Sequence, residues 1–139
     1  MRRGPLAAAI ALGVALPVHA FSPAVDYAIH CQGCHLADGT GTPGSGVPAL
    51  AGSVGRFPGV PGGREYLIRV PGVSQSALDD TALAALLNWV VQHFDAADLP
   101  ADFAPYTAEE IGRTRRPPLT DVEGTRKGLV RAMGSTDRR

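Results

Sequence analysis

The sequence predicts a mostly helical fold, and three observations carry that prediction. Apolar residues between Leu83 and Phe94 recur every three or four positions, which places them on one side of an α-helix. Ser22-Pro23 is typical of a helix start, and so are two Thr-x-x-Glu segments that begin at Thr107 and Thr120. Nothing along the chain reads as the strand–helix–strand alternation of a parallel sheet.

Residues 1–20 have the pattern of a secretory signal peptide. Arginines stand at positions 2 and 3, an apolar run extends from Leu6 to Leu16, and small residues stand at Val18 and Ala20. The run is shorter than the roughly 20 apolar residues that cross a bilayer. We therefore expect cleavage before residue 21 and export to the periplasm.

The helix that begins at Ser22-Pro23 leads into a C-x-x-C-H segment, residues 31–35, which contains the only two cysteines of the chain. This pattern is typical of covalent haem attachment. Cys31 and Cys34 would each form a thioether with one vinyl group of the same porphyrin, and His35 would be the proximal iron ligand. We expect one covalently bound haem c.

Three other interpretations of this segment are weaker. A thioredoxin-like redox site belongs near a βαβ pattern, which the chain lacks. A zinc site would need His30, Cys31, Cys34 and His35 together, whereas zinc modules normally use two separated ligand pairs. A plain disulfide suits an oxidising compartment but leaves the histidine unexplained.

The Gly- and Pro-rich stretch from Gly39 to Gly63 predicts a long irregular loop. A loop of this length in a small domain needs something to enclose, and one face of a haem would serve. Residues 64–70 predict a short helix that Pro71-Gly72 breaks.

The apolar residues of the next helix occupy positions 83, 86, 87, 90, 91 and 94, with Asp79 or Asp80 as the expected cap. We expect Trp89 to pack against the first helix.

The two Thr-x-x-Glu segments predict helices over about 108–115 and 121–132, separated by Pro117-Pro118. We expect disorder over 134–139.

Charge is unevenly distributed, although the formal net charge is zero. Residues 21–106 sum to −5, and residues 107–139 sum to +3. This pattern bears on which partners the protein attracts and on how charge steers their encounter, rather than on fold. Nothing in the sequence resembles a nucleic-acid module.

We divide the chain into a signal peptide (1–20), a haem domain (21–98) and a C-terminal extension (99–139). A core of this size is small for independent stability, and a buried porphyrin would add the missing apolar surface.

Together these residues resemble the class I c-type cytochromes. The resemblance is carried by Tyr27, the haem motif, Asp38-Gly39-x-Gly41, Pro48-x-Leu50-x-Gly52, Gly55-Arg56 and the terminal amphipathic helix. It implies an all-α fold in which the first and last helices cross, loops enclose the haem and one haem edge stays exposed. By this resemblance the Pro48 carbonyl accepts a hydrogen bond from His35 Nδ1, and Arg56 approaches a haem propionate.

The sequence departs from that family at the second axial ligand. Most members supply a methionine just before the last helix, but the only methionine after residue 20 is Met133. Superposing the two patterns puts Gln75 in the ligand position, and an amide oxygen is a weak ligand for ferrous iron. The open alternatives are a water, His93, Asn88, His30, or Met133 folding back.

The resemblance implies a periplasmic carrier of single electrons, not an enzyme, that works with a dehydrogenase or a terminal acceptor. Two alternatives remain: a haem protein with an open or weakly ligated iron that binds a small ligand in sensing, and a haem subunit of a larger redox complex. We expect no membrane span after the signal peptide. We also expect residues from Thr107 onward to act on partner choice. The alternative is that an apolar face including Leu119 and Val122 docks them on the body.

Overall fold

The computed structural model describes residues 21–136, so the predicted signal peptide and residues 137–139 lie outside the described part of the chain. Within residues 21–136 the ordered elements are helical, and extended pairing is limited to one bridge between Thr42 and Val47. The predicted all-α fold is confirmed. The elements are α1 (Pro23–His30), α2 (Gln32–His35), η1 (Pro43–Ser45), η2 (Val54–Gly59), α3 (Gly63–Arg69), α4 (Pro71–Ser74), α5 (Asp80–Asp95), η3 (Ala96–Asp98), α6 (Ala108–Thr114) and α7 (Val122–Thr136).

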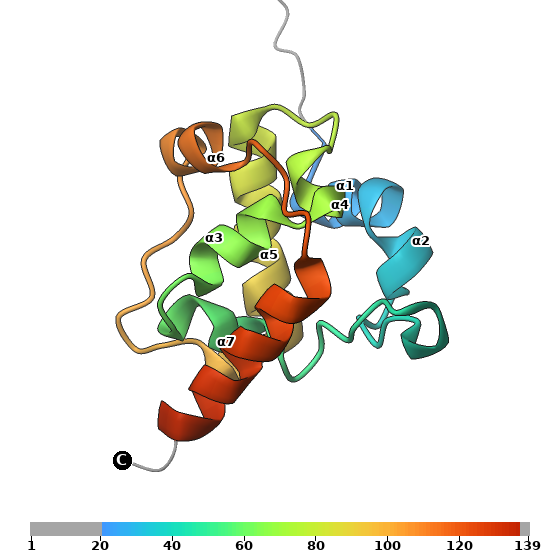
Figure 1. The fold of residues 1–139 in the computed structure, drawn as a ribbon. Helices are drawn as coiled ribbons and strands as arrows, with labels where there is room; N and C mark the ends of the chain where they lie inside the picture. The colour runs from blue at the N-terminus through green and yellow to red at the C-terminus, as the bar shows by residue number, and fades with distance from the viewer. Residues whose placement is uncertain (1–20, 137–139) are drawn as a thin grey trace, which may run out of the picture.

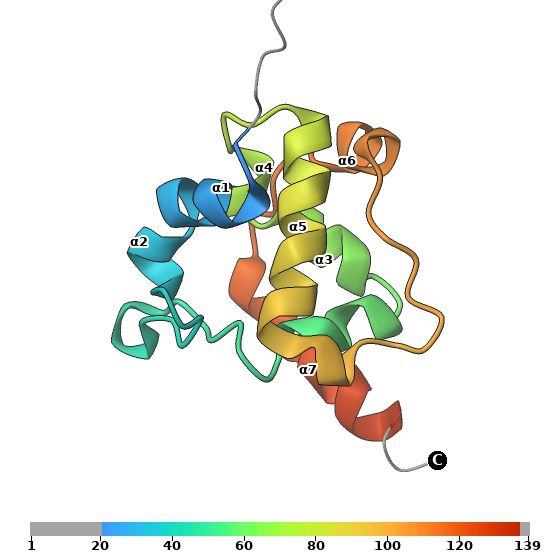
Figure 2. The ribbon, with the colours of Figure 1, turned by 180° about the vertical axis from the view of Figure 1, so that it is seen from behind.

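Helix α5 runs through the middle of the molecule (Figures 1 and 2). Helix α1 crosses it on one side, and α6 lies beside its N-terminal end, in contact with it. The predicted apolar stripe forms its buried side: Leu83, Leu86, Leu87, Val90 and Val91 are each at most 6% exposed. As expected, Asp79 caps the helix by accepting a hydrogen bond from the Ala82 N–H at 2.8 Å.

An aromatic cluster joins α1 to α5. The ring centroid of Tyr27 lies 5.4 Å from that of Trp89 and 5.0 Å from that of Phe94. Trp89 therefore packs against the first helix, as predicted. The start of α1 is also as predicted, because the Ser22 hydroxyl accepts from the Val25 N–H and Pro23 occupies the first turn.

The segment after α3 differs from the prediction in one respect. Helix α3 ends at Arg69, close to the expected position, but Pro71 begins a further helical turn, α4, instead of a break. Proline has no N–H to lose at the first position of a helix and its φ angle already suits that position. The chain therefore continues as helix in a new direction after Val70, whose ψ of 138° is extended.

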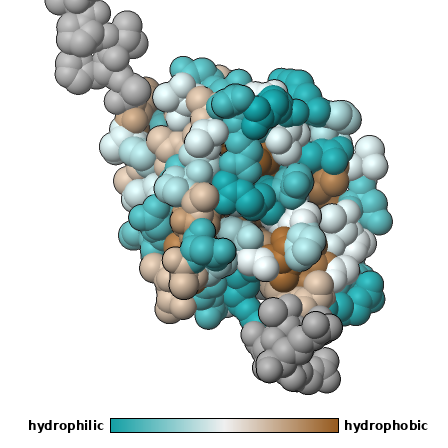
Figure 3. All heavy atoms as spheres, turned by 90° about the vertical axis from the view of Figure 1, so that its left-hand side faces the viewer, coloured by the Kyte–Doolittle hydropathy of each residue, from teal (hydrophilic) through white to brown (hydrophobic). Residues whose placement is uncertain are grey.

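The C-terminal segment is part of the core, so residues from Thr107 onward pack on the body, as in the docking alternative, and do not form an accessory element that acts on partner choice alone. Ile111 in α6 is fully buried, and Leu129 and Met133 in α7 are 9% and 6% exposed. All three belong to the same hydrophobic cluster as the body. The face that carries α6 is mostly hydrophilic, with apolar atoms visible only in small patches (Figure 3).

The helix boundaries of this segment also differ in detail from those predicted. Thr107 caps α6 as expected, but Glu110 pairs with Arg64 of α3. Asp121, rather than Thr120, accepts from the Gly124 N–H near the start of α7. Helix α7 continues to residue 136, so the predicted disorder from 134 is wrong for residues 134–136. Between residues 21 and 136, no helix has the length and apolar character needed to cross a bilayer.

Candidate functional site

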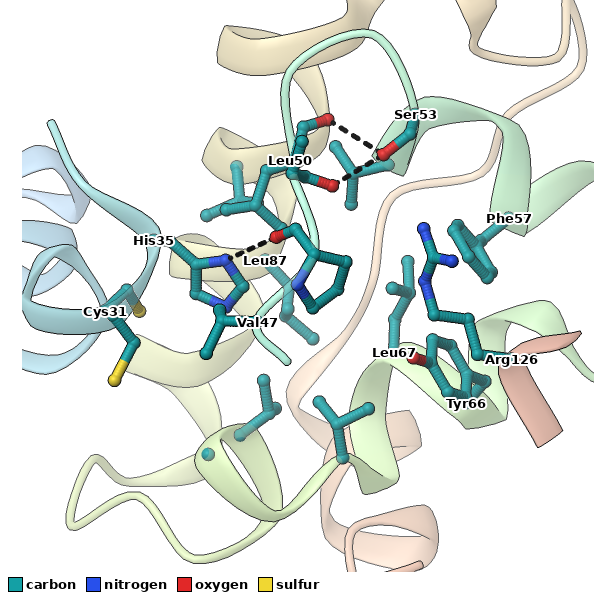
Figure 4. Close-up of a pocket in the computed structure, with 18 of the residues that line it drawn as sticks. Cys31, His35, Val47, Leu50, Ser53, Phe57, Tyr66, Leu67, Leu87 and Arg126 are labelled. Carbon is teal, nitrogen blue, oxygen red and sulfur yellow. Dashed lines mark hydrogen bonds between the residues drawn. The ribbon is translucent and has the colours of Figure 1, made fainter. Parts of the chain in front are cut away.

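A cavity of about 290 Å³ lies among α2, the loop after it, α3, α4 and α5. In Figure 4, α1 and α2 lie on one side of this cavity, and the pale green α3–α4 segment lies across it. Most of its lining is apolar, including Leu50, Leu67, Val70, Leu86 and Leu87. The cavity thus offers an apolar environment with a few polar groups, as cofactor sites usually do.

Both cysteines and His35 line this cavity because the chain bends at Cys31. Cys31 ends α1 and begins α2, with non-helical φ and ψ of −124° and −37°. One turn of α2 then brings Cys34 and His35 to the same side, and the His35 N–H donates to the Cys31 carbonyl at 2.9 Å. The two thiols are free, with Cys31 half-buried and Cys34 exposed. Burial raises the pKa of Cys31 to about 11, so its sulfur is a thiol at neutral pH.

His35 is oriented by the loop that follows it. Its Nδ1 lies 3.2 Å from the Pro48 carbonyl oxygen, as predicted from the family resemblance (Figure 4). Because a carbonyl only accepts, this bond puts the proton on Nδ1 and leaves the Nε2 lone pair free. Burial lowers the pKa of His35 and outweighs the opposing effect of the Pro48 hydrogen bond, so the imidazole ring is neutral at pH 7. A neutral imidazole is the form that binds a metal.

Gly41 allows the Pro48 carbonyl to approach. It has a positive φ of 71°, and a Cβ atom at this position would lie 2.6 Å from the Pro48 oxygen. Its own N–H donates to the His35 carbonyl at 3.0 Å. The glycine of the family pattern therefore has a steric role in the support of His35.

The donor set fits a covalently bound haem. Two thiols at the rim and one imidazole lie along a single apolar cavity, which matches the needs of two thioethers, one axial bond and a buried porphyrin. The zinc alternative has no support within residues 21–136, where no group of three or more His, Cys, Asp or Glu side chains is arranged so that it could hold a metal ion.

Two predicted site residues lie outside the cavity lining. Gln75 is exposed and follows the last residue of α4. Arg56 is half-buried, and its positive charge lowers the pKa of Asp95, although burial raises that pKa overall. The predictions that Gln75 binds iron and that Arg56 approaches a propionate draw no support from these positions.

The sequence analysis missed Arg126 and Tyr66, which do line the cavity. Figure 4 shows Arg126 of α7 beside the stacked rings of Phe57 and Tyr66, whose centroids are 5.1 Å apart. The Arg126 guanidinium lies 5.9 Å from the Phe57 ring centroid. Arg126 is one helical turn beyond Val122, another lining residue, and this i, i+4 spacing was the available signal.

The other candidate iron ligands have partners elsewhere. Met133 is packed in the core and does not line the cavity, and His93 is exposed and stacks on Trp89 with centroids 4.2 Å apart. Both amide atoms of Asn88 bond to the backbone of Tyr106, at 2.8 and 2.9 Å. His30 differs from these three because it lines the cavity, but it is exposed and directly precedes Cys31 in the chain.

An all-α fold around an apolar cavity that gathers two thiols and one oriented imidazole defines a c-type cytochrome. Among curated proteins, the chain is 37% identical over 108 residues to cytochrome c-552 of Thermus thermophilus, covering 65% of this chain and 82% of the relative. A cytochrome c-552 from Thermus thermophilus strain ATCC 27634 matches at the same identity, and the match covers 72% of that relative. No family profile matches the chain. The chain belongs to the c-type cytochromes, which are electron carriers that hold haem c covalently.

Proposed function

We propose that this protein is a periplasmic monohaem cytochrome that carries single electrons to or from a periplasmic dehydrogenase or a terminal acceptor. The observation that carries the proposal is the meeting of Cys31, Cys34 and His35 on one apolar cavity, with His35 held by Pro48. When bound, the haem supplies an iron that gains and loses one electron.

The chain's own residues have distinct roles in this proposal. Cys31 and Cys34 would hold the porphyrin, and the Nε2 atom of His35 would bind the iron. The Pro48 carbonyl keeps the ring in place and increases its basicity, which favours the ferric state. The apolar lining excludes water and so limits the reorganisation that accompanies electron transfer.

We further propose that no methionine is bound to the iron. Met133 is 6% exposed and belongs to the cluster formed by Leu129 and the body. Bringing it to the cavity would remove a large side chain from the core, at a cost of about 2–5 kcal/mol. Oxidised protein should therefore lack the weak red charge-transfer band of an Fe–S(Met) bond, and Met133→Leu should leave the spectrum unchanged. A band that disappears in Met133→Leu would contradict this proposal.

Haem attachment is tested by acid–acetone extraction and intact mass. The haem should stay with the polypeptide, and the mass should exceed that of residues 21–139 by one haem. Cys31→Ala and Cys34→Ala should each lower the yield of holoprotein, and His35→Ala should change the iron spectrum. Haem that extracts into acetone from the unaltered protein would overturn the proposal.

The location and the division of the chain are tested separately. N-terminal sequencing of protein from the periplasmic fraction should begin at Phe21, the residue after the expected cleavage site. If residues 21–98 and 99–139 form one stable unit, limited proteolysis should cut near the C-terminus only in unfolded protein. Holoprotein recovered from the cytoplasm with residues 1–20 attached would contradict the export proposal.

A further inference from the structure

The segment between α4 and α5 is held by one buried arginine from the C-terminal part of the chain. Arg115 donates to the carbonyls of Ser74, Ser76 and Leu78 at 3.3, 2.7 and 3.1 Å. It also forms an ion pair with Asp80 at 2.8 Å. In return, the buried Ser74 hydroxyl donates to the Arg115 carbonyl. We call this set of contacts the Arg115 clamp.

The Arg115 clamp determines where Gln75 lies. Gln75 stands between two residues whose carbonyls are both bound to the guanidinium, and its own N–H donates to the Pro71 carbonyl at 3.0 Å. Its side chain is exposed and outside the cavity lining. Moving it to the cavity would break several charge-assisted hydrogen bonds to a side chain that is only 10% exposed, and such bonds are costly to leave unmade.

The cavity wall next to the Arg115 clamp is apolar. Val70, Gly72 and Val73 contribute to it, and they belong to or adjoin α4, across the cavity from α2. The Tyr66 hydroxyl faces the same space (Figure 4). Met133, His93 and Asn88 are committed to contacts elsewhere. The α4 side of the cavity therefore presents the apolar side chains of Val70 and Val73 and none of these three candidate ligands.

We propose that the Arg115 clamp leaves the second axial position of the iron to a small neutral ligand of the carbon monoxide and nitric oxide class, received against Val70 and Val73. This inference rests on the haem attachment proposed above. It adds a ligand-binding site to an electron carrier, and Arg115 acts in it as a positioning residue.

The probe is carbon monoxide added to the reduced full-length holoprotein. The Soret band should shift and sharpen, with saturation at one carbon monoxide per haem. Val73→Met places a thioether on the cavity wall and should create the Fe–S(Met) band. If that thioether occupies the position nine-tenths of the time, the apparent affinity for carbon monoxide falls about tenfold. Val130→Met is the matched control, because Val130 is 42% exposed on α7 and outside the cavity lining.

Three further substitutions test the Arg115 clamp and Tyr66. Gln75→Ala should leave carbon monoxide binding unchanged in an otherwise wild-type protein. In Arg115→Gln, the released segment lets Gln75 compete for the position, so carbon monoxide binding should weaken. Adding Gln75→Ala to Arg115→Gln should restore it. Tyr66→Phe tests whether the Tyr66 hydroxyl, which faces the same space, occupies the position instead of an added ligand. If Arg115→Gln fails to fold, the wild-type and Val73→Met measurements still decide the question.

The inference is overturned if reduced wild-type protein with covalently retained haem does not bind carbon monoxide. It is also overturned if Gln75→Ala or Tyr66→Phe alone increases that binding, because one of these side chains would then occupy the position. Haem that extracts into acid–acetone is a different result, which removes the proposed function itself.

Discussion

Arg64 in α3 and Glu110 in α6 form a two-armed ion pair, with Nε–Oε1 and Nη2–Oε2 distances of 2.8 and 2.6 Å. The same guanidinium donates to the Ala104 carbonyl at 2.7 Å and lies 4.1 Å from the ring centroid of Tyr106. One side chain of the body therefore holds three points of the segment that leads into and forms α6. This relationship explains why the basic C-terminal segment is packed and not free.

Replacing Glu110 with glutamine should destabilise the fold by about 1 kcal/mol, because a bidentate, half-buried pair is stronger than an ordinary surface pair. Glu109→Gln is the matched control. Glu109 pairs with Arg113 one turn away, and both side chains are more than two-thirds exposed. Chemical unfolding of the two variants should separate them, and equal midpoints would contradict the structural role of Arg64.

Ile111→Ala should destabilise the protein by about 2–5 kcal/mol, because this fully buried side chain would leave a cavity at the α5–α6 contact. A chain ending at Asp98 should lose more stability and also change its haem spectrum, since Val122 and Arg126 line the cavity. Thermal unfolding and absorbance spectra check both expectations. A truncated protein with an unaltered spectrum and melting temperature would restore the expectation that residues from Thr107 onward act only on partner choice.

Gly41→Ala should weaken the support of His35. The new Cβ would meet the Pro48 carbonyl oxygen at 2.6 Å, in a backbone region that already costs alanine about 1–2 kcal/mol. Because displacement of the carbonyl lowers the basicity of the imidazole, the ferric state loses stabilisation and the reduction potential should rise. Gly52→Ala is the control, since Gly52 has a φ of 65° but nothing within 4 Å of its would-be Cβ, and it lies outside the cavity lining. Equal potentials in both variants would contradict this role.

Asp95→Asn should change how stability depends on pH. Burial raises the pKa of Asp95 above its ordinary 3.8, although a 2.7 Å hydrogen bond from the Gly55 N–H opposes the shift. A carboxyl with a raised folded pKa contributes stability below 3.8 that is lost as pH rises through the folded pKa. Asparagine keeps the acceptor and does not ionise.

The melting temperature of Asp95→Asn relative to wild type should therefore be higher at pH 7 than at pH 4. Asp102→Asn serves as the control because Asp102 is exposed on the loop before α6. A difference that stays constant between the two pH values would show that burial of Asp95 carries no penalty.

Local patterns in the sequence determined the elements and the centre of the site. The cap at Asp79, the stripe from Leu83 to Phe94 and the C-x-x-C-H segment depend on residues within one or two helical turns of each other, so their spacing carries the information. The family resemblance also predicted the bond between His35 and Pro48, because their separation is short and their loop has a recurring pattern.

Only the tertiary structure decided what lies across the cavity from His35. Arg126 reaches it from α7, and Arg115 binds the segment around Gln75 from 39 or more residues away, through the carbonyls of Ser74 and Ser76. Backbone carbonyls have no residue type, so no sequence pattern marks them as the partners of a distant guanidinium. The packing of residues 99–139 was equally hidden, because the burial of Ile111 depends on the relative placement of α5 and α6 and not on their separate sequences.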